Sequence, residues 1–220
     1  MIRIVWVSLL LTCLTALPAR AHPHVFIDAG LTLVMDEDGR VAALRVAWAY
    51  DAFYSLMLIE DNGLDADHDG VPEPGELERL AGRDVDWEAP DFGGDLEVLV
   101  DGEPVALGGP MRHTAAWSDG RYVTTHLRPV ETRIDPAAHS ISARIYDPGY
   151  FAFYEITLPL RVEGRADCRL LRIPADLDAA EDALREKIAQ LPANVDAEAE
   201  YPRVGAIFAD SLRLECTAPS

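Results

Sequence analysis

The alternation of apolar and polar residues along the chain predicts a protein built mainly of short β-strands. Residues 24–35 and 41–50 form two strand-like runs, and the acidic, glycine-containing segment 36–40 between them has the composition of a hairpin turn. In the first run, apolar residues such as Val25 and Ile27 occupy alternating positions, as one buried face of a strand requires. The first part of the domain is therefore expected to be an antiparallel hairpin.

Strand signals resume in the second half of the chain and define the fold class. Further strand-like runs are expected at residues 94–100, 110–118, 121–130, 139–147, 150–158, 166–173 and 204–216. Many short strands separated by turn signals favour an antiparallel β-sandwich. The fold class that we predict is mainly β with some helix (α+β), with a sandwich-like core.

Three segments depart from this pattern and show helical spacing of their apolar residues. Residues 51–61 and about 74–82 lie on either side of an acidic loop, and residues 175–190 form a longer periodic stretch. The apolar face of that stretch consists of Leu177, Ala180, Leu184, Ile188 and Leu191. We therefore predict a helical insertion at about 51–83 and one C-terminal amphipathic helix in a single domain that spans 22–220.

The first 21 residues have the organisation of a secretory signal peptide. Arg3 supplies the positive start, residues 4–17 the apolar core, and Ala19-Arg20-Ala21 a small-residue cleavage site. The apolar core is too short to span a bilayer, so no stable membrane insertion is expected once the signal is removed. We predict a periplasmic protein, cleaved after Ala21, whose mature chain begins at His22.

The charge of the chain is strongly negative, with 19 Lys and Arg against 38 Asp and Glu and a formal net charge of −19. Nucleic acids and anionic lipid surfaces are bound by clusters of Lys and Arg, so this composition argues against both as partners. A surplus of carboxylates suits a protein that works among cations. Solubility alone would explain the charge equally well.

The three cysteines divide between the signal and the mature chain. Cys168 and Cys216 form an even pair in an exported chain, which favours a disulfide over two free thiols. Cys13 lies inside the apolar core of the signal after Thr12, where lipid attachment is the alternative to removal with the signal.

The sharpest chemical signal is the segment 65–76, which matches the calcium-loop pattern D-x-D-x-D-G-x5-E. Calcium takes about six to eight oxygen ligands, and Gly70 occupies the loop position where the chain must turn sharply. The expected ligands are Asp65, Asp67, Asp69, the carbonyl of Val71, Glu73 and Glu76. With no second loop in the chain, we predict a lone, structural Ca²⁺ site in an EF-hand-like insertion; the alternative is an acidic surface turn without an ion.

The predicted mature terminus carries a second candidate metal site. His22 and His24 alternate in an extended segment, so their rings would point the same way, and the new α-amino group adds a third nitrogen. Pro23 has no backbone N–H and removes the amide-nitrogen chelate that other termini form. Amine and imidazole donors suit Ni²⁺, Co²⁺, Zn²⁺ or Cu²⁺. The alternative is two solvated histidines.

Two further groups of residues are weaker candidates. A two-residue turn at Asp119-Gly120 would place Trp117 opposite Tyr122 and His113 opposite His126, where two imidazoles could share an ion or form an ordinary polar pair on a solvated face.

The aromatic stretch 146–154 contains Asp147 and Tyr150, which could face a cleft or complete a metal shell. Aromatic residues of this kind serve equally well as core and corner residues of a sandwich.

No catalytic motif points to an enzyme: the chain has no Gly-x-Ser-x-Gly, no phosphate-binding glycine loop and no His-Glu-x-x-His. Whether the protein catalyses a reaction therefore stays open. There are two alternatives to a non-enzymatic metal-binding role. One is a copper enzyme that uses the terminal histidine as a brace, and the other is a solute-binding component of a transport system with an aromatic pocket.

Four motifs together carry a family resemblance: residues 22–28, 65–76, 146–150, and 205–210 followed by Cys216. In these the chain resembles the exported bacterial family called domain of unknown function 1007. The resemblance implies a periplasmic component associated with nickel/cobalt-type membrane transport, without an established reaction. It also implies as candidate ligands His22, His24 and Asp28, the loop acids, and Asp147 with Tyr150.

From these observations we expect a calcium-stabilised, non-enzymatic accessory protein that presents or senses a transition metal for an inner-membrane metal transporter.

Overall fold

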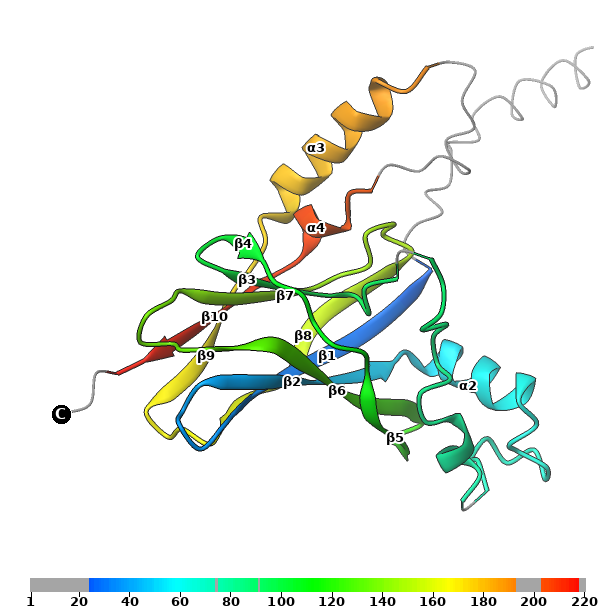
Figure 1. Ribbon diagram of the computed structural model, residues 1–220. Coiled ribbons are helices and arrows are strands. Elements are labelled where there is room, and N and C mark those ends of the chain that lie inside the picture. Colours follow the sequence, from blue (N-terminus) through cyan, green and yellow to red (C-terminus); the bar gives the residue numbers. More distant parts are fainter. Residues whose placement is uncertain (1–23, 74, 91, 193–202, 218–220) are drawn as a thin grey trace, which may run out of the picture.

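Two packed β-sheets form the body of the protein in the computed structural model, which describes residues 24–73, 75–90, 92–192 and 203–217 (Figure 1). Within these residues each sheet has five strands. The first sheet has the order β5 (Met111–Ser118), β6 (Arg121–Ile134), β2 (Val41–Tyr50), β1 (Val25–Met35) and β8 (Ala152–Glu163). The second has the order β4 (Glu103–Pro104), β3 (Leu96–Val100), β7 (Ile141–Ile145), β10 (Ser211–Cys216) and β9 (Cys168–Ile173). The predicted mainly β sandwich is confirmed.

The predicted hairpin of β1 and β2 is confirmed, with Ile27 opposite Tyr50 and Leu33 opposite Leu44. The predicted antiparallel arrangement has one exception, because β1 pairs with β8 in parallel. This first sheet is therefore mixed. Alternation of apolar residues fixes which side of a strand is buried, but it does not identify the neighbouring strand or its direction.

The core lies between the two sheets and follows the alternation of the sequence. On the first sheet Leu31, Leu44 and Trp48 are fully buried, and they face Val98 and Leu212 of the second. Burying one such large apolar side chain contributes about 1.5–3 kcal/mol relative to leaving it exposed. The facing sheets therefore bury one continuous apolar cluster.

Between β2 and β3 the chain forms the predicted helical segment, α2 (Ala52–Asp61) and the 3₁₀ helix η2 (Leu77–Leu80), at one end of the first sheet (Figure 1). Asp51 caps α2, because its carboxylate accepts hydrogen bonds from the backbone N–H of Tyr54 at 2.8 Å and of Phe26 in β1 at 3.0 Å. The buried hydroxyl of Ser55 accepts a bond of 2.9 Å from the N–H of Tyr122. The helix is thus fastened to both β1 and β6.

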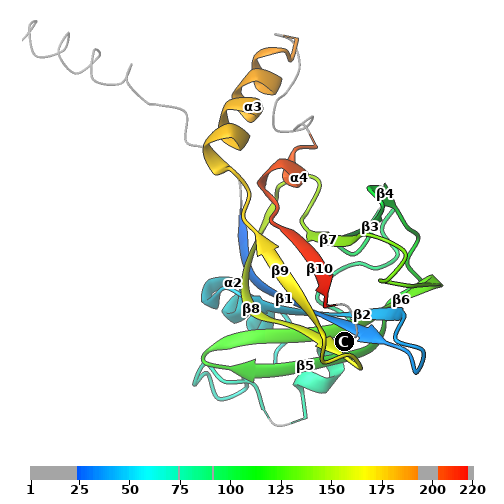
Figure 2. The same ribbon diagram turned by 90° about the vertical axis from the view of Figure 1, so that its left-hand side faces the viewer.

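The C-terminal part contains two helices that project from the sandwich, α3 (Leu177–Ala189) and α4 (Gly205–Phe208) (Figure 2). The predicted strand at 204–216 is wrong over its first half, because α4 occupies it and β10 begins only at Ser211. Ala180 of α3 is buried in a small cluster beside Phe208, whereas Leu177 is 50% and Ile188 40% exposed. The predicted apolar face of α3 is therefore only partly covered by the described residues.

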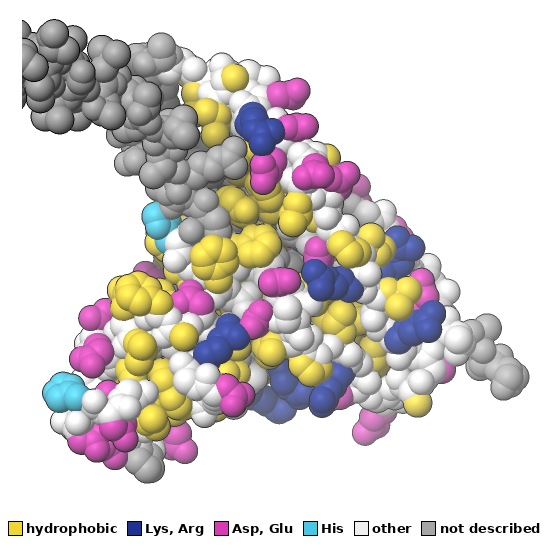
Figure 3. Space-filling model, turned by 180° about the vertical axis from the view of Figure 1, so that it is seen from behind, with side chains coloured by type: hydrophobic (Ala, Val, Ile, Leu, Met, Phe, Trp, Pro, Cys, Tyr) yellow, Lys and Arg dark blue, Asp and Glu magenta, His cyan; other side chains and the backbone are white. Residues whose placement is uncertain are grey.

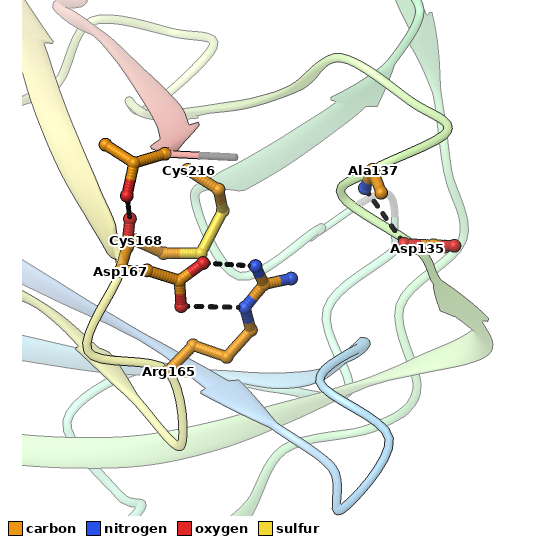
Figure 4. Close-up of a disulfide and its surroundings, with 7 residues drawn as sticks. Asp135, Ala137, Arg165, Asp167, Cys168 and Cys216 are labelled. Carbon is orange, nitrogen blue, oxygen red and sulfur yellow. Dashed lines mark hydrogen bonds and ion pairs between the residues drawn. A yellow bond between two sulfur atoms is a disulfide. The ribbon is translucent and has the colours of Figure 1, made fainter. Parts of the chain in front are cut away.

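The cysteine pair joins the two last strands of the second sheet. Cys168 in β9 lies directly opposite Cys216 in β10, and the two form a disulfide (Figure 4). Beside it, Arg165 forms an ion pair with Asp167. The backbone carbonyl of Asp167 accepts a hydrogen bond of 2.9 Å from the N–H of Thr217. The disulfide therefore holds a hydrogen-bonded strand end.

None of the helices in the described residues is long and apolar enough to cross a membrane.

Candidate metal loop and acidic pocket

The segment 65–70, the first half of the predicted calcium loop, turns as its sequence predicts. Asp65 is only 5% exposed, and its carboxylate accepts hydrogen bonds from the backbone N–H of Asp69 at 3.0 Å and of Gly70 at 2.8 Å. Gly70 has φ +83°, a left-handed conformation that glycine adopts without strain. The first carboxylate of the motif thus organises the loop around itself.

Three carboxylates of this loop converge. Asp65, Asp67 and Asp69 can each offer an oxygen atom such that these atoms lie within 4.8 Å of one another. Acidic side chains also gather on the surface at this end of the molecule, at the lower left in Figure 3. Three like charges this close repel one another unless a cation or protons compensate them.

The two glutamates of the motif do not join this group in the described structure. The Oε1 of Glu76 accepts a hydrogen bond of 2.7 Å from Arg79, and its Oε2 is buried without a hydrogen-bond partner among the described residues. A buried carboxylate oxygen without a partner is costly. The donor set of hard oxygens, with one such orphaned atom, fits calcium.

The second cluster of potential ligands in the described residues shares Asp65 with the first. Glu60, Asp65 and His68 also bring one ligand atom each within 4.8 Å, and the His68 Nδ1 lies 3.9 Å from Glu60 Oε1. His68 is exposed. Sequence spacing did not reveal this grouping, because Glu60 belongs to the preceding helix.

At the start of the described chain, His24 lies beside the turn that precedes β8. Its backbone N–H donates to the carbonyl of Phe151 at 2.8 Å, and the two rings are 4.8 Å apart between centroids. His22, the other histidine of the predicted terminal site, lies outside the described residues. The terminal metal site therefore stays a prediction.

Asp28, the third residue of that predicted site, forms an ion pair with Arg121. Burial raises its pKa, but hydrogen bonds from Thr157 and Arg121 outweigh this and hold the pKa below its usual value. Asp28 is therefore ionised and already carries a positive partner. Among the described residues it is not grouped with His24 as a potential ligand set.

His113 and His126 lie beside each other, as predicted, but at an irregular place in the ladder rather than as a regular cross-strand pair. The register follows the hairpin rule from Ser118 opposite Arg121 to Thr114 opposite Thr125 and then shifts, with Arg112 at φ 54°. The rings of the two histidines lie 6.1 Å apart. A bulge inserts an extra residue into one strand, and the turn alone does not predict where this happens.

The alternative expectation, a polar pair on a solvated face, is wrong for His126, which is only 2% exposed. Its ring packs edge-on against Trp48 and Trp87, each 4.8 Å away between ring centroids. Burial, together with the charge of Arg128 and the neighbouring His113, lowers the pKa of His126 to about 3. His126 is thus a neutral core residue, and its role as a metal ligand stays an untested prediction.

Asp147 and Tyr150 are both used to build the turn before β8. The carboxylate of Asp147 accepts three backbone hydrogen bonds, from Gly149 at 2.8 Å, Phe151 at 2.7 Å and Ala152 at 3.0 Å. The ring of Tyr150 stacks on Phe208 with 4.2 Å between centroids. These contacts match the corner and core roles that the sequence also allowed, and metal ligation by either residue stays a prediction.

Next to this turn is a pocket of about 500 Å³ whose lining includes Asp147, which the sequence allowed to face a cleft. Its floor is formed by strand residues, among them Val25, Tyr50 and Tyr154, and its walls include the carboxylates of Asp84 and Asp95. Both aspartates lie between η2 and β3, and the sequence singled out neither of them; Asp95 falls in the strand expected at 94–100, which begins only at Leu96. Only the folded chain brings them over the strands.

The carboxylates of the pocket are hydrogen-bonded by tyrosines. Tyr154 donates its hydroxyl to Asp95 at 2.7 Å, and Tyr50 donates to Asp84 at 3.0 Å. Burial raises the pKa of Asp95, the Tyr154 bond lowers it and the nearby charge of Asp147 raises it, giving a value of about 7. Ionised Asp95 is therefore disfavoured in the empty pocket below neutral pH.

We expect the substitution Asp95→Asn to stabilise the fold at alkaline pH. The raised pKa means that the stability contributed by protonated Asp95 is lost as pH rises from the unfolded value near 3.8 through about 7. The amide oxygen retains the bond from Tyr154. Because the site is partly solvated, we expect a gain on the order of 1 kcal/mol at pH 8 and much less at pH 5.

Urea unfolding at the two pH values measures this difference, with Glu78→Gln, an exposed carboxylate elsewhere, as the control. An Asp95→Asn effect that is the same at pH 5 and pH 8 would contradict the raised pKa.

Comparison with known proteins gives one further finding. A family model described as "Protein of unknown function (DUF1007)" matches residues 7–216. No curated protein matches the chain.

Proposed function

This chain belongs to the DUF1007 family, and from that premise we propose that it is an exported metal-binding accessory protein. In this proposal Ca²⁺ stabilises the loop 65–76, and the histidines of the processed terminus present or sense a transition metal. The recipient would be an inner-membrane metal transporter. The observation that carries the proposal is the convergence of Asp65, Asp67 and Asp69 within a loop whose turn conformation suits calcium.

The calcium loop supports a structural role because it lies next to core residues. Leu64 immediately before it and Leu80 after it are both buried in the main apolar cluster. The backbone N–H of Glu73 donates to the carbonyl of Leu64 at 3.0 Å and draws the two ends of the loop together. A cation bound by Asp65, Asp67 and Asp69 would neutralise their repulsion and so favour the folded segment.

The terminal site is supported by position. His24 is exposed, and its backbone is fixed through Phe151 to the turn before β8, so a metal held there would be presented at the surface beside the acidic pocket. Imidazole nitrogens bind zinc, copper, nickel and cobalt, whereas the oxygen ligands of the loop prefer calcium. The two sites would therefore take different metals without competing.

The first experiment measures the metals bound to mature protein purified from periplasm, by elemental analysis, together with its intact mass. We expect a chain that begins at His22, about one equivalent of calcium and a bound transition metal. The double substitution His22→Ala and His24→Ala should remove the transition metal and leave calcium in place. A protein without transition metal, or one that keeps it in the double variant, would contradict the terminal site.

The calcium loop is tested separately with Asp67→Asn. Asp67 is exposed, so its loss should weaken calcium binding with little effect on the loop itself. Calcium at about 100 times its dissociation constant stabilises a folded protein by about 2.7 kcal/mol, or a Tm increase of roughly 5–10 °C in a domain of this size. We expect this increase in the wild type and its loss in Asp67→Asn.

Glu78→Gln removes one equally exposed negative charge outside the loop and should retain the full increase in Tm with calcium. Magnesium serves as the second control, because it prefers an octahedral site with bound waters. An equal response of all three proteins to calcium would rule out the loop as the binding site.

A further inference from the structure

We propose that the pocket lined by Asp84, Asp95, Asp147 and the tyrosines binds a small organic ammonium ion. This site is separate from the two metal sites of the proposed function. The pocket is formed where the start of β1, the turn before β8 and the segment after η2 meet at one end of the sandwich (Figure 1). Its volume of about 500 Å³ is of the size that small-molecule sites have.

The charge of the pocket favours a cation. Asp84, Asp95 and Asp147 line it, and within the described residues none of the three forms an ion pair with Arg, Lys or His. One positive side chain, the exposed Arg203, also lines the pocket, so the acidic groups outnumber it. A low-dielectric wall next to uncompensated carboxylates attracts and holds positive charge.

The spacing of the carboxylates argues for an organic cation and against a bare metal ion. The ligand atoms of Asp84, Asp95 and Asp147 do not form a group within 4.8 Å among the described residues, so one ion could not bind all three directly. An extended molecule can place its ammonium group at one carboxylate and its body along the wall. The lining therefore selects for size as well as charge.

The apolar part of the lining suits the body of such a molecule. Val25, Ile27 and Tyr154 form a floor of nearly buried side chains on neighbouring strands, and Tyr50 stacks on Tyr54 with 5.1 Å between ring centroids. Phe151, which is 52% exposed, stands at the rim. Aromatic faces attract ammonium groups through their quadrupole, and strand residues hold the geometry without reorganisation.

The polar contacts of the floor would also orient the ligand. Tyr154 donates its hydroxyl to Asp95 and Tyr50 donates to Asp84, so each carboxylate presents its remaining lone pairs in a fixed direction. Asp147 uses both oxygens to accept backbone bonds of its turn. Asp95 and Asp84 are therefore the direct acceptors for the ammonium group, and Asp147 shapes the pocket and adds negative charge.

The test is calorimetric titration of the calcium-loaded mature protein at pH 8 with benzylamine and with benzyl alcohol, which share a skeleton and differ in charge. We expect benzylamine to bind at least 10-fold more tightly than the alcohol. Asp95→Asn should weaken the binding of benzylamine at least 10-fold and leave the affinity for benzyl alcohol unchanged. The same variant is expected to be stably folded, so lost binding would not reflect unfolding.

Two further variants test the sign of the ligand charge and the location of the site. Arg203→Gln removes the positive charge of the rim and should maintain or strengthen benzylamine binding, whereas an anionic ligand would lose affinity. Glu78→Gln removes an acid outside the pocket and should change nothing. Equal binding of amine and alcohol, absence of binding by both, or an unchanged Asp95→Asn would overturn the proposal, whatever the metal analysis shows.

Discussion

Replacement of both Cys168 and Cys216 by serine is expected to lower the free energy of unfolding by about 4 kcal/mol. The disulfide joins residues 48 apart in the sequence, and a cross-link of this span removes many conformations from the unfolded chain. In the folded protein the two residues are direct partners in an antiparallel pair, so the sheet itself holds them together. Removal of the disulfide therefore destabilises the protein mainly because the unfolded chain gains conformational entropy.

Urea unfolding of the oxidised wild type and of the double serine variant measures this effect. The wild type reduced with dithiothreitol is the matched control, because it loses the cross-link without a change in sequence. It should unfold at the same urea concentration as the double variant. A difference of less than about 1 kcal/mol between oxidised wild type and double variant would mean that the unfolded chain is already restricted in this region.

The second large effect is expected from Gly205→Ala, which should destabilise the protein by about 3 kcal/mol. A Cβ atom at Gly205 would lie 1.8 Å from the backbone carbonyl oxygen of Asp147, and the N–H of Gly205 donates to the carbonyl of Pro148 at 3.2 Å. Helix α4 thus lies directly on the turn that forms one wall of the acidic pocket. A side chain there would push the two backbones apart.

Gly109→Ala is the matched control, because a Cβ at Gly109 meets no atom within 4 Å. Its effect on unfolding should stay within about 0.5 kcal/mol, as for other surface substitutions. Because Gly205→Ala would displace the turn at Asp147, we also expect it to weaken benzylamine binding, which Gly109→Ala should not do. Equal stability of the two variants would show that α4 does not pack on the turn in solution.

The elements were predictable from sequence wherever the signal is local. The strands at 25–35 and 41–50 and the helix at 52–61 match their expected positions within about one residue, because alternation and helical spacing are read from neighbouring residues. The strand expected at 204–216 shows the limit of this approach. Ile207 and Phe208 from its first half pack in the small C-terminal cluster as part of α4 instead.

The candidate sites divide in the same way. The carboxylates of Asp65, Asp67 and Asp69 come from one short loop, so spacing alone indicated that they would converge, and they do. The histidines at 113 and 126 come from two strands. They lie beside each other, but at a register shift next to Thr114 that the turn did not predict. Pairing across strands depends on every residue between the turn and the site.

The sequence by itself determined the mainly β character of this protein, the turn at Gly70 and the acidic loop around it, because each depends on residues close together in the chain. The tertiary structure alone decided that β1 pairs in parallel with β8, that His126 is buried between two indoles, and that Asp84 and Asp95 face the strand floor. These contacts join segments far apart in the sequence. Which of these long-range contacts form depends on the packing that buries the most apolar surface while pairing the polar groups. Local sequence patterns do not specify that packing.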